Sequence, residues 1–337
     1  MKKVSYNFSS QTTDCYFDGE LARLNELVDP AQAVIITDEN VYSAHKKKFS
    51  GWKLIVVPAG EEFKVQDTVN DIIRQLIELK ADRKTFIVGI GGGVITDMTG
   101  FVASIYMRGL RFGFVPTTIL AMVDASIGGK NGIDFGLYKN LVGIIRQPRF
   151  LLYDVSLLKT LPAAEWINGF AEIIKHSCIK DLRLFKELGQ HKLSFYKKDS
   201  AALKKLVRRN AVIKSDVVKA DEFETGERKL LNFGHTLGHA IENMYKFSHG
   251  QAISIGMTAA CELSADLTGF RDTELVVNLL SRYGLPTYTE YDKPKAFDIL
   301  RMDKKKDADN MNFVLLKSIG KAIVYPIPIV ELEKRFS

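Results

Sequence analysis

The sequence predicts an α/β domain followed by a largely helical domain. In the first half, short apolar runs alternate with amphipathic helical patterns, which is typical of a parallel sheet with helical crossovers. From about residue 163 to the low 280s, helical periodicity continues almost without interruption. The 337 residues suit two domains of roughly 100–200 residues each. We place the boundary near residue 155, which gives domains 1–155 and 156–337.

The elements of the first half follow from periodicity. Runs of β-branched and aromatic residues predict strands at residues 33–37, 54–57, 85–90 and 111–116. Between them, Val69, Ile72 and Leu76 recur at helical spacing and predict a helix over 69–79. A second helix is expected from about residue 96 to 107. Strand–helix alternation of this kind predicts a parallel sheet with helical crossovers.

The second half is expected to contain six helices and a final strand. Pro162 and Pro286 punctuate the helical region. The expected helices are 165–179, 182–188, 200–219, 227–245, 252–267 and 273–283, and the strand-like run is 313–316. A cleft between an α/β half and a helical half is a favoured place for a ligand.

Composition excludes several classes of protein. Apolar residues make up 46% and charged residues 26%, so the chain is neither disordered nor collagen-like. The net charge of 47 − 40 = +7 suits an anionic small molecule better than nucleic acid. No apolar run is long enough for a membrane span, and none follows Lys2 and Lys3 as a signal peptide would require. Cys15, Cys178 and Cys261 are far apart, which favours a reducing cytoplasm.

A glycine run lies between a predicted strand and a predicted helix. Gly91, Gly92 and Gly93 would let the backbone approach a phosphate closely, and the helix start adds N–H donors. Val94 departs from the dinucleotide fingerprint, so a tight strand-to-helix turn remains the alternative. Asp38 ends the first strand, where a carboxylate binds a ribose hydroxyl or caps a helix.

Three of the six histidines fall within 15 positions. His235 and His239 are four residues apart and share one helix face, and His249 follows ten residues later. Two imidazoles and a carboxylate with an open position form a catalytic zinc pattern. Packed core histidines are the alternative. Spacing alone does not decide whether the carboxylate is Glu172, Glu222 or Glu242.

Cationic residues lie in glycine- and asparagine-rich loops and near the histidines. If they converge, they suit a substrate with phosphate and carboxylate groups. For any single one, a solvated surface charge is the alternative. The set is Arg108, Lys130, Lys139, Lys175, Lys214 and Arg228.

These motifs, in this order, resemble the 3-dehydroquinate synthases of the shikimate pathway. The resemblance covers roughly residues 30–325. It rests on Gly91-Gly92-Gly93-Val94-Ile95-x-Asp97, Tyr106-Met107-Arg108-Gly109, Val115-Pro116-Thr117-Thr118, Val123-Asp124-x-Ser126-Ile127-Gly128-Gly129-Lys130, Lys139-Asn140, Leu158-Lys159-Thr160-Leu161-Pro162, Ala171-Glu172-Ile173-Ile174-Lys175, Asp221-Glu222, Asn232-x-Gly234-His235-Thr236-x-Gly238-His239-Ala240-Ile241-Glu242, His249-Gly250 and Asp303-Lys304-Lys305.

The resemblance implies an N-terminal Rossmann-like NAD-binding domain and a C-terminal helical domain that binds metal and substrate, with the active site in the cleft between them. It implies conversion of 3-deoxy-D-arabino-heptulosonate 7-phosphate to 3-dehydroquinate and phosphate. The steps are NAD-catalysed oxidation, phosphate elimination, reduction, ring opening and intramolecular aldol closure. It also implies a cytoplasmic homodimer that uses Zn²⁺ or Co²⁺, with no nucleic-acid or membrane partner.

The resemblance assigns site residues as well. The metal ligands would be Glu172, His235 and His249. NAD would contact Asp38, Asn40, Glu61, Lys64, Gly92, Gly93, Asp97, Thr117, Thr118, Lys139 and Thr160. Substrate and catalytic groups would be Arg108, Asp124, Lys130, Asn140, Lys175, Lys214, Arg228, Asn232, His239 and Lys305, the last from the pair Lys304-Lys305.

Two rival functions share most of these features. Another sugar-phosphate cyclase would use the same cofactors and close a different ring. A metal-dependent alcohol or glycerol dehydrogenase would carry a similar histidine set but would accumulate NADH. Thr96 and Asn131 depart from the usual glycine and threonine of the synthases, and we expect Thr96 to narrow the nucleotide pocket.

Overall fold

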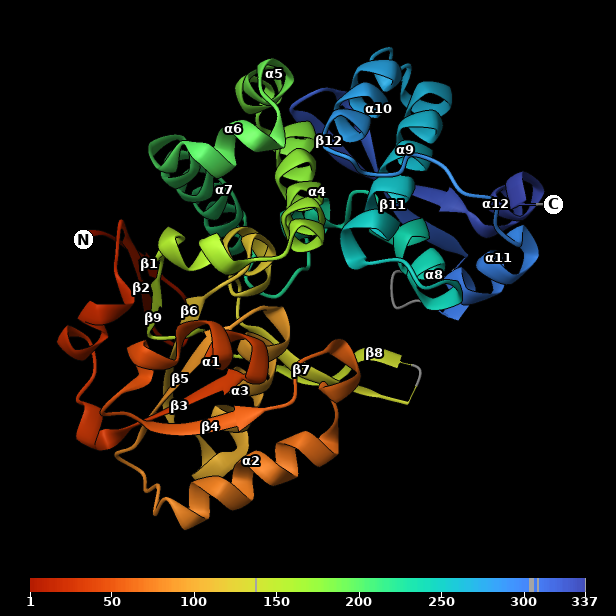
Figure 1. Ribbon diagram of the computed structural model, residues 1–337. Helices are drawn as coiled ribbons and strands as arrows, with labels where there is room; N and C mark the ends of the chain where they lie inside the picture. Colours follow the sequence, from red (N-terminus) through yellow and green to blue (C-terminus); the bar gives the residue numbers. More distant parts are fainter. Residues whose placement is uncertain (137, 303–305, 308, 337) are drawn as a thin grey trace. The chain divides into compact units, whose positions relative to one another are not determined.

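The computed structural model describes residues 1–136, 138–302, 306–307 and 309–336, and it separates into two compact units (Figure 1). The first unit comprises Met1–Trp166 and Ser200–Phe223, and the second comprises Ile167–Asp199 and Glu224–Ser337. Each unit is therefore discontinuous along the chain, whereas the expected domains 1–155 and 156–337 are contiguous. The helix at 200–220 accounts for most of this difference.

The first unit is built on a seven-stranded sheet with the order β1-β2-β9-β6-β5-β3-β4. Every neighbouring pair from β2 to β4 is parallel, and only β1 runs antiparallel to its neighbour. The strands are β1 (Lys2–Asn7), β2 (Thr12–Phe17), β3 (Ala33–Asp38), β4 (Lys53–Val57), β5 (Phe86–Gly91), β6 (Arg111–Pro116) and β9 (Phe150–Leu152). The four expected strands are confirmed as β3, β4, β5 and β6.

Helices cover this sheet on both faces. Right-handed crossovers between parallel strands place α1 on one face and both α2 and α3 on the other. Consistent with this, α2 contacts α3, and α3 packs on β5 and β6, while α7 packs on β1. The bounds are α1 (Glu39–His45), α2 (Gln66–Glu78), α3 (Gly93–Ile105) and α7 (Ser200–Ala220). The helices expected at 69–79, 96–107 and 200–219 are confirmed.

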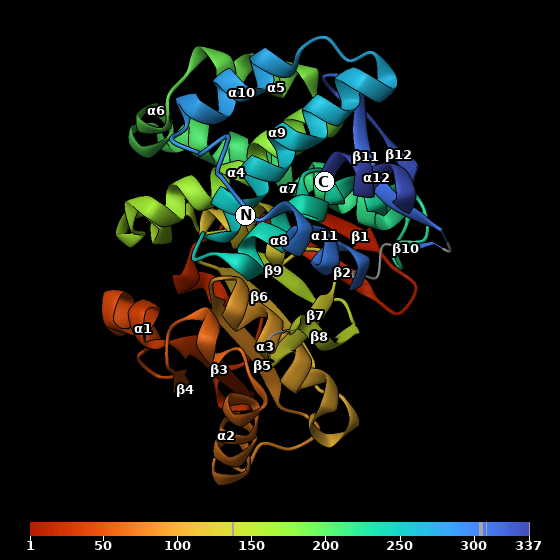
Figure 2. The same cartoon turned by 90° about the vertical axis from the view of Figure 1, so that its right-hand side faces the viewer.

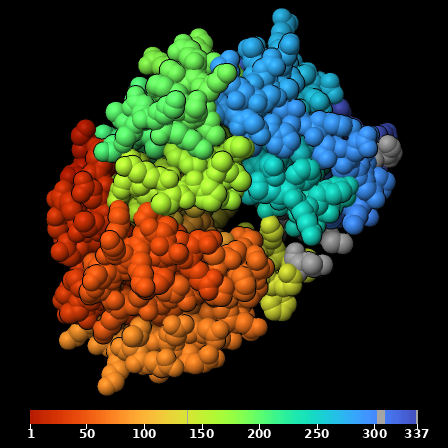
Figure 3. All heavy atoms as spheres, viewed as in Figure 1, coloured from red at the N-terminus to blue at the C-terminus, as the bar shows by residue number. Residues whose placement is uncertain are grey.

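A two-stranded hairpin extends from the first unit and was not expected. It consists of β7 (Lys130–Phe135) and β8 (Tyr138–Ile145), paired antiparallel. Every residue of β8 is exposed, including Leu141, Ile144 and Ile145. The yellow atoms of this segment lie at the surface in Figure 3.

The second unit combines helices with a three-stranded antiparallel sheet, β10-β11-β12. Buried side chains of α8, α9, α11, β11 and β12 form its core, and Figure 2 shows α12 beside β12. The bounds are α4 (Ala163–Lys180), α5 (Leu182–Gln190), α6 (Leu193–Lys198), α8 (His235–Met244), α9 (His249–Thr268), α10 (Thr273–Arg282), α11 (Lys293–Met302), β10 (Lys306–Asp307), β11 (Asn310–Ser318), β12 (Lys321–Pro328) and α12 (Ile329–Phe336). Only β11 of this sheet was expected.

The continuous helix expected over 227–245 is wrong. The segment forms a short 3₁₀ turn at Glu227–Asn232, and α8 then begins at His235. Gly234 separates the two with φ +78°, a left-handed conformation that no helix interior contains. A Cβ at this position would also lie 2.8 Å from the Ile253 carbonyl oxygen. The break places His235 at the first position of α8.

Over the described residues, no helix is both long enough and apolar enough to cross a bilayer.

Candidate active site

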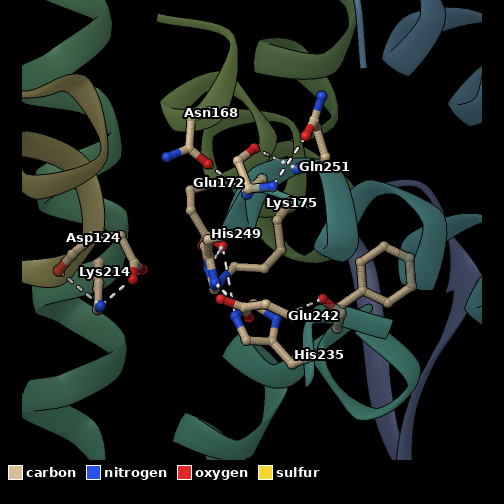
Figure 4. Close-up of polar contacts among 12 residues, drawn as sticks. Asp124, Asn168, Glu172, Lys175, Lys214, His235, Glu242, His249 and Gln251 are labelled. Carbon is tan, nitrogen blue, oxygen red and sulfur yellow. Dashed lines mark hydrogen bonds and ion pairs between the residues drawn. The ribbon is translucent and has the colours of Figure 1, made fainter. Parts of the chain in front are cut away.

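Three potential metal ligands meet inside the second unit. Glu172 comes from the middle of α4, His235 from the start of α8 and His249 from the start of α9 (Figure 4). One ligand atom from each lies within 4.8 Å of the other two. The Nε2 atoms of His235 and His249 lie 3.6 Å and 3.4 Å from the same oxygen, Glu172 Oε1. The structure thus brings together the three residues that the resemblance implied as ligands.

Contacts on the far side of each ring fix the histidine tautomers. His235 Nδ1 lies 3.2 Å from the Phe233 carbonyl oxygen, which can only accept a hydrogen bond. His249 Nδ1 lies 3.4 Å from Glu242 Oε2. Both rings therefore donate from Nδ1, which leaves Nε2, the atom that faces Glu172, as the nitrogen available to a metal. Metal-binding histidines are typically held in this way.

Glu172 divides its two oxygens between different partners. Oε1 faces the histidines, whereas Oε2 is ion-paired with Lys175, which lies one helical turn further along α4. Glu172 and Lys175 are 0% and 1% exposed. A buried charge of either sign requires such a partner, because desolvation is costly. Lys175 thus neutralises the carboxylate without lying on the side that faces the histidines.

The donor set fits a divalent cation. Around a tetrahedral Zn²⁺ with bonds of about 2.0–2.1 Å, neighbouring ligand atoms are about 3.3–3.4 Å apart. The two Nε2–Oε1 distances, 3.6 Å and 3.4 Å, are close to that spacing. Two imidazoles and one carboxylate leave a fourth position for water or substrate.

The electrostatics of this cluster also favour a cation. Burial alone would lower the pKa of His249, but hydrogen bonds and negative charge from Glu172 and Glu242 raise it to about 9. The carboxylates thus stabilise positive charge at the position where the three ligand atoms converge.

Sequence spacing did not decide which of three carboxylates is the ligand, but their positions in the structure distinguish them. Glu172 is the one whose oxygen faces both Nε2 atoms. Glu242 contacts the opposite edge of the His249 ring. Glu222 belongs to the first unit, where it accepts hydrogen bonds from the Ser9 backbone N–H and the Gln147 side chain.

Three other expected substrate residues lie in α8 or in the 3₁₀ turn that precedes it. The ring of His239 lies 5.2 Å from that of His235, and Arg228 is buried two turns upstream. Asn232 donates to Glu224 Oε1 at 2.6 Å. Sequence reasoning missed Glu224, Asn168 and the role of Glu242. Glu242 lies at i+7 from His235, so helical spacing offered a signal for it, but none marked the other two.

In the first unit, two expected substrate residues, the buried Lys214 and the half-buried Asp124, form an ion pair. Lys214 of α7 lies 2.7 Å from Asp124 Oδ1 and donates to the Asp124 carbonyl oxygen at 2.8 Å. Asp124 belongs to a single π-helical turn, Ala121–Ala125, and such turns are frequent at functional sites. Lys130, Arg108 and Lys139 are exposed.

The residue next to Lys130 anchors its loop. The Asn131 side chain donates to the Gly129 and Arg146 carbonyl oxygens at 2.7 and 2.8 Å. Arg146 donates in turn to the Ala103 carbonyl oxygen of α3 at 3.0 Å. The unusual asparagine therefore fixes the base of the β7–β8 hairpin.

Another group of expected residues meets around a buried lysine. Lys64 is 4% exposed and its Nζ lies 2.6 Å from both Asp97 Oδ2 and Asn140 Oδ1. Burial alone would lower the pKa of Lys64, but Asp97 and Glu61 outweigh it and raise the pKa. Lys64 therefore links two other residues expected at the cofactor, Glu61 and Asp97, to Asn140, which is expected at the substrate.

The remaining cofactor residues lie mostly at one edge of the sheet. Parallel register brings the carboxyl ends of β3, β5 and β6 together. The residues there are Asp38, Asn40, Gly92, Gly93, Thr117 and Thr118. Asp38 caps α1 by accepting from the Val41 N–H at 2.9 Å. Thr160 lies elsewhere, 3.0 Å from His45 Nε2.

This edge fits a nucleotide phosphate. A Cβ on Gly92 would lie 3.1 Å from Thr118 Cγ2, so a side chain here would crowd this surface. Over the described residues, no side chain caps α3, and Thr117 Oγ1 is buried without a hydrogen-bond partner. The first turn of α3 therefore offers N–H donors to an anion. Thr96 is buried and its hydroxyl donates to the Gly93 carbonyl oxygen at 3.0 Å.

Lys305, expected at the substrate, and its neighbours Asp303 and Lys304 lie outside the described residues.

Comparison with known proteins gives two family matches. Residues 54–168 match the model described as 3-dehydroquinate synthase N-terminal, and residues 169–306 match 3-dehydroquinate synthase C-terminal. A 3-dehydroquinate synthase from Acetivibrio thermocellus is 38% identical over 99% of this chain and 98% of its own length.

Solved structures of two enzymes share the fold. One is 2-deoxy-scyllo-inosose synthase complexed with carbaglucose-6-phosphate, NAD⁺ and Co²⁺, with a TM-score of 0.86, 24% identity and 99% coverage of both chains. The other is 2-epi-5-epi-valiolone synthase from Streptomyces hygroscopicus with NAD⁺ and Zn²⁺ bound. It has a TM-score of 0.85 and 27% identity, and it covers 99% of this chain and 96% of its own.

Proposed function

Because the chain belongs to the 3-dehydroquinate synthase family, we propose that it converts 3-deoxy-D-arabino-heptulosonate 7-phosphate to 3-dehydroquinate and phosphate. The observation that carries the proposal is the cluster of Glu172, His235 and His249 beside the buried Lys175. A metal-binding carboxylate with a neighbouring fixed cation suits a substrate that has hydroxyl, carbonyl and anionic groups.

Glu172, His235 and His249 would hold a divalent cation, Zn²⁺ or Co²⁺. When bound, such a cation supplies Lewis acidity to a substrate hydroxyl and to the ketone formed from it. The protein's part is to present three ligands and leave one position open. With Glu172, Glu242 and Lys175 charged and both histidines neutral, the residues contribute −1, so a dication gives +1. That surplus favours an anionic substrate.

The edge of the seven-stranded sheet would hold NAD. When bound, NAD supplies a reversible hydride acceptor that is unchanged over the whole reaction. Support comes from the uncapped start of α3, the Cβ-free surface at Gly92 and the buried hydroxyl of Thr117. Asp38, Asn40, Gly93 and Thr118 lie at the same edge. Glu61, Lys64 and Asp97 form the charged group beside Asn140, and we assign Lys139 and Thr160 to the same cofactor.

A set of charged and amide side chains would bind the substrate and its leaving phosphate. We assign this role to Arg108, Asp124, Lys130, Asn140, Lys175, Lys214, Arg228, Asn232 and Lys305. His239 has its ring next to the metal ligands, and we assign it proton exchange with a substrate hydroxyl at one of its ring nitrogens. Lys175 stabilises negative charge that develops on the substrate oxygens.

In functional terms, we propose that residues 1–155 bind NAD and that 156–337 carry the metal and most of the substrate contacts. We further propose a cytoplasmic homodimer. The exposed apolar side chains of β8 support self-association, since monomers seldom expose so many neighbouring apolar side chains. Three buried free thiols support a reducing compartment.

The test is phosphate release from 3-deoxy-D-arabino-heptulosonate 7-phosphate, followed with and without added NAD, before and after chelation, with NADH absorbance recorded throughout. We expect release that requires NAD and metal, with no net NADH. Accumulation of NADH on simple polyols, without phosphate release, would place the protein with the metal-dependent dehydrogenases. Phosphate release from a different sugar phosphate only would make it another cyclase.

A further inference from the structure

Glu242 contacts His249 but is not one of the three potential metal ligands. Glu242 lies near the end of α8, two turns after His235, and its side chain is 9% exposed. Its Oε2 lies 3.4 Å from His249 Nδ1, whereas His249 Nε2 lies 3.4 Å from Glu172 Oε1. The two carboxylates therefore contact opposite edges of one imidazole. Glu242 lies on the Nδ1 edge, away from the Nε2 atom that faces Glu172.

The backbone of His249 is fixed independently of Glu242. Ser248 and Gln251 form a reciprocal capping box at the start of α9. The Gly250 N–H donates to Asn168 Oδ1 at 2.5 Å, and Asn168 lies one turn before Glu172 on α4. These contacts set where the His249 Cα lies but leave the rotation of the ring about its side-chain bonds undetermined.

We propose that Glu242 is a positioning residue that orients the His249 ring and increases the basicity of its Nε2 towards the metal. The inference rests on the proposed metal site. The carboxylate accepts the Nδ1–H, which fixes the tautomer in which Nε2 has a lone pair, and its negative charge strengthens that donor. His235 differs, because the acceptor for its Nδ1–H is a neutral backbone carbonyl. Substitution of Glu242 can therefore change the strength of His249 as a ligand, whereas no side-chain substitution removes the carbonyl that His235 contacts.

The test compares E242A, E242Q and the control E262Q, which removes an exposed carboxylate from α9. Zinc affinity is measured on the full chain without substrate, by competition with a chromophoric chelator. The visible absorption of the Co²⁺-loaded protein is recorded in parallel. Far-UV circular dichroism and thermal unfolding of the metal-free proteins establish that each variant folds.

We expect E242A to lose roughly 10- to 100-fold in zinc affinity and to shift the Co²⁺ absorption bands. E242Q should lose less, because the amide oxygen still accepts the Nδ1–H while the charge is gone. E262Q should match the wild type. If E242A does not fold, the affinity of E242Q decides, since it must fall below that of E262Q.

Wild-type affinity and Co²⁺ absorption in a folded E242A, or in E242Q if E242A does not fold, would overturn the inference. A wild-type protein that binds no zinc, or one in which E172Q leaves zinc affinity intact, would instead overturn the proposed metal site. The two failures are therefore distinguishable, and neither readout depends on turnover.

Discussion

At the scale of single residues, Glu172 combines properties that rarely occur together. It is fully buried and charged, it faces two imidazoles with one oxygen, and it pairs with a lysine through the other. Its removal leaves Lys175 as a buried cation without that carboxylate, in addition to a lost ligand. Substitution at this position should therefore affect metal content and charge balance at once.

For Glu172→Gln we expect loss of tightly bound metal and a fall in turnover of roughly 10³-fold or more, because an amide is a weaker ligand and carries no charge. Metal content by elemental analysis and phosphate release measure the two effects. The control is Glu274→Gln, an exposed position in the first turn of α10. Normal metal content together with full activity in the Glu172 variant would contradict the assignment.

The buried cysteines give a prediction about pH. Burial raises the pKa of both Cys15 and Cys178 to about 12. Because the raised pKa favours the neutral thiol, only about one thiol in 10⁴ is ionised at pH 8. We expect both to resist a thiolate-specific reagent in the native protein at pH 8 and to react fully in denaturant. Rapid labelling of the native chain would contradict their burial.

Sequence analysis could predict features of the site that depend on one helix, but not those that depend on how separate elements pack. The spacing of His235 and His239 correctly indicated a shared helix, but it could not show that Gly234 ends the preceding turn and sets the direction of each ring. The choice among Glu172, Glu222 and Glu242 depends on which strands and helices pack together. Spacing along one element contains no such information, so the resemblance had to supply the choice.

At the scale of elements, the turn at Gly234 is the point where local backbone and packing requirements coincide. Its φ is +78°, and a Cβ would meet Met257 Cγ at 2.5 Å and the Ile253 carbonyl oxygen at 2.8 Å. Gly269, which ends α9, has a similar φ of +73° but open space around it. Substitution of Gly269 therefore reports the backbone strain alone, whereas substitution of Gly234 reports the same strain together with steric conflict.

We expect Gly269→Ala to destabilise the fold by about 1–2 kcal/mol, the cost of a left-handed alanine. Gly234→Ala should cost at least about 1 kcal/mol more, because backbone atoms of α9 have to move. Chemical denaturation of the metal-free proteins measures both. Equal destabilisation would show that the close contacts at Gly234 relax freely.

Two of the strands that sequence analysis missed, β8 and β12, were hidden for different physical reasons. All residues of β8 are exposed, so no alternation of buried and exposed side chains marks it as a strand. Pro326 and Pro328 occur within β12, and proline argues against a strand unless that strand is at an edge, as β12 is. The parallel strands β3, β5 and β6 were predictable because they are buried on both faces and read as apolar runs.

At the scale of the whole molecule, the β7–β8 hairpin is the surface that we connect with self-association. Ile144 lies on β8 and is 42% exposed; it shares one face of the strand with Val142, and Leu141 and Ile145 are exposed on the other face. We expect Ile144→Lys to lower the sedimentation coefficient from that of a dimer towards that of a monomer, because a charge in an apolar interface is costly. Ile77→Lys, at an exposed position on α2, is the matched control. An unchanged oligomeric state in Ile144→Lys would place the interface elsewhere.

The return of the chain to the first unit at Ser200–Phe223 has a consequence for biosynthesis. The segment Ile167–Asp199 belongs to the second unit, so the ribosome delivers part of one unit before it completes the other. At about 5–20 residues per second, the nascent chain waits roughly 3–11 s between residue 166 and residue 223, while α7 is absent from the surface of β1. During that interval the surface of β1 that α7 covers is exposed, and a pause in translation there would prolong its exposure.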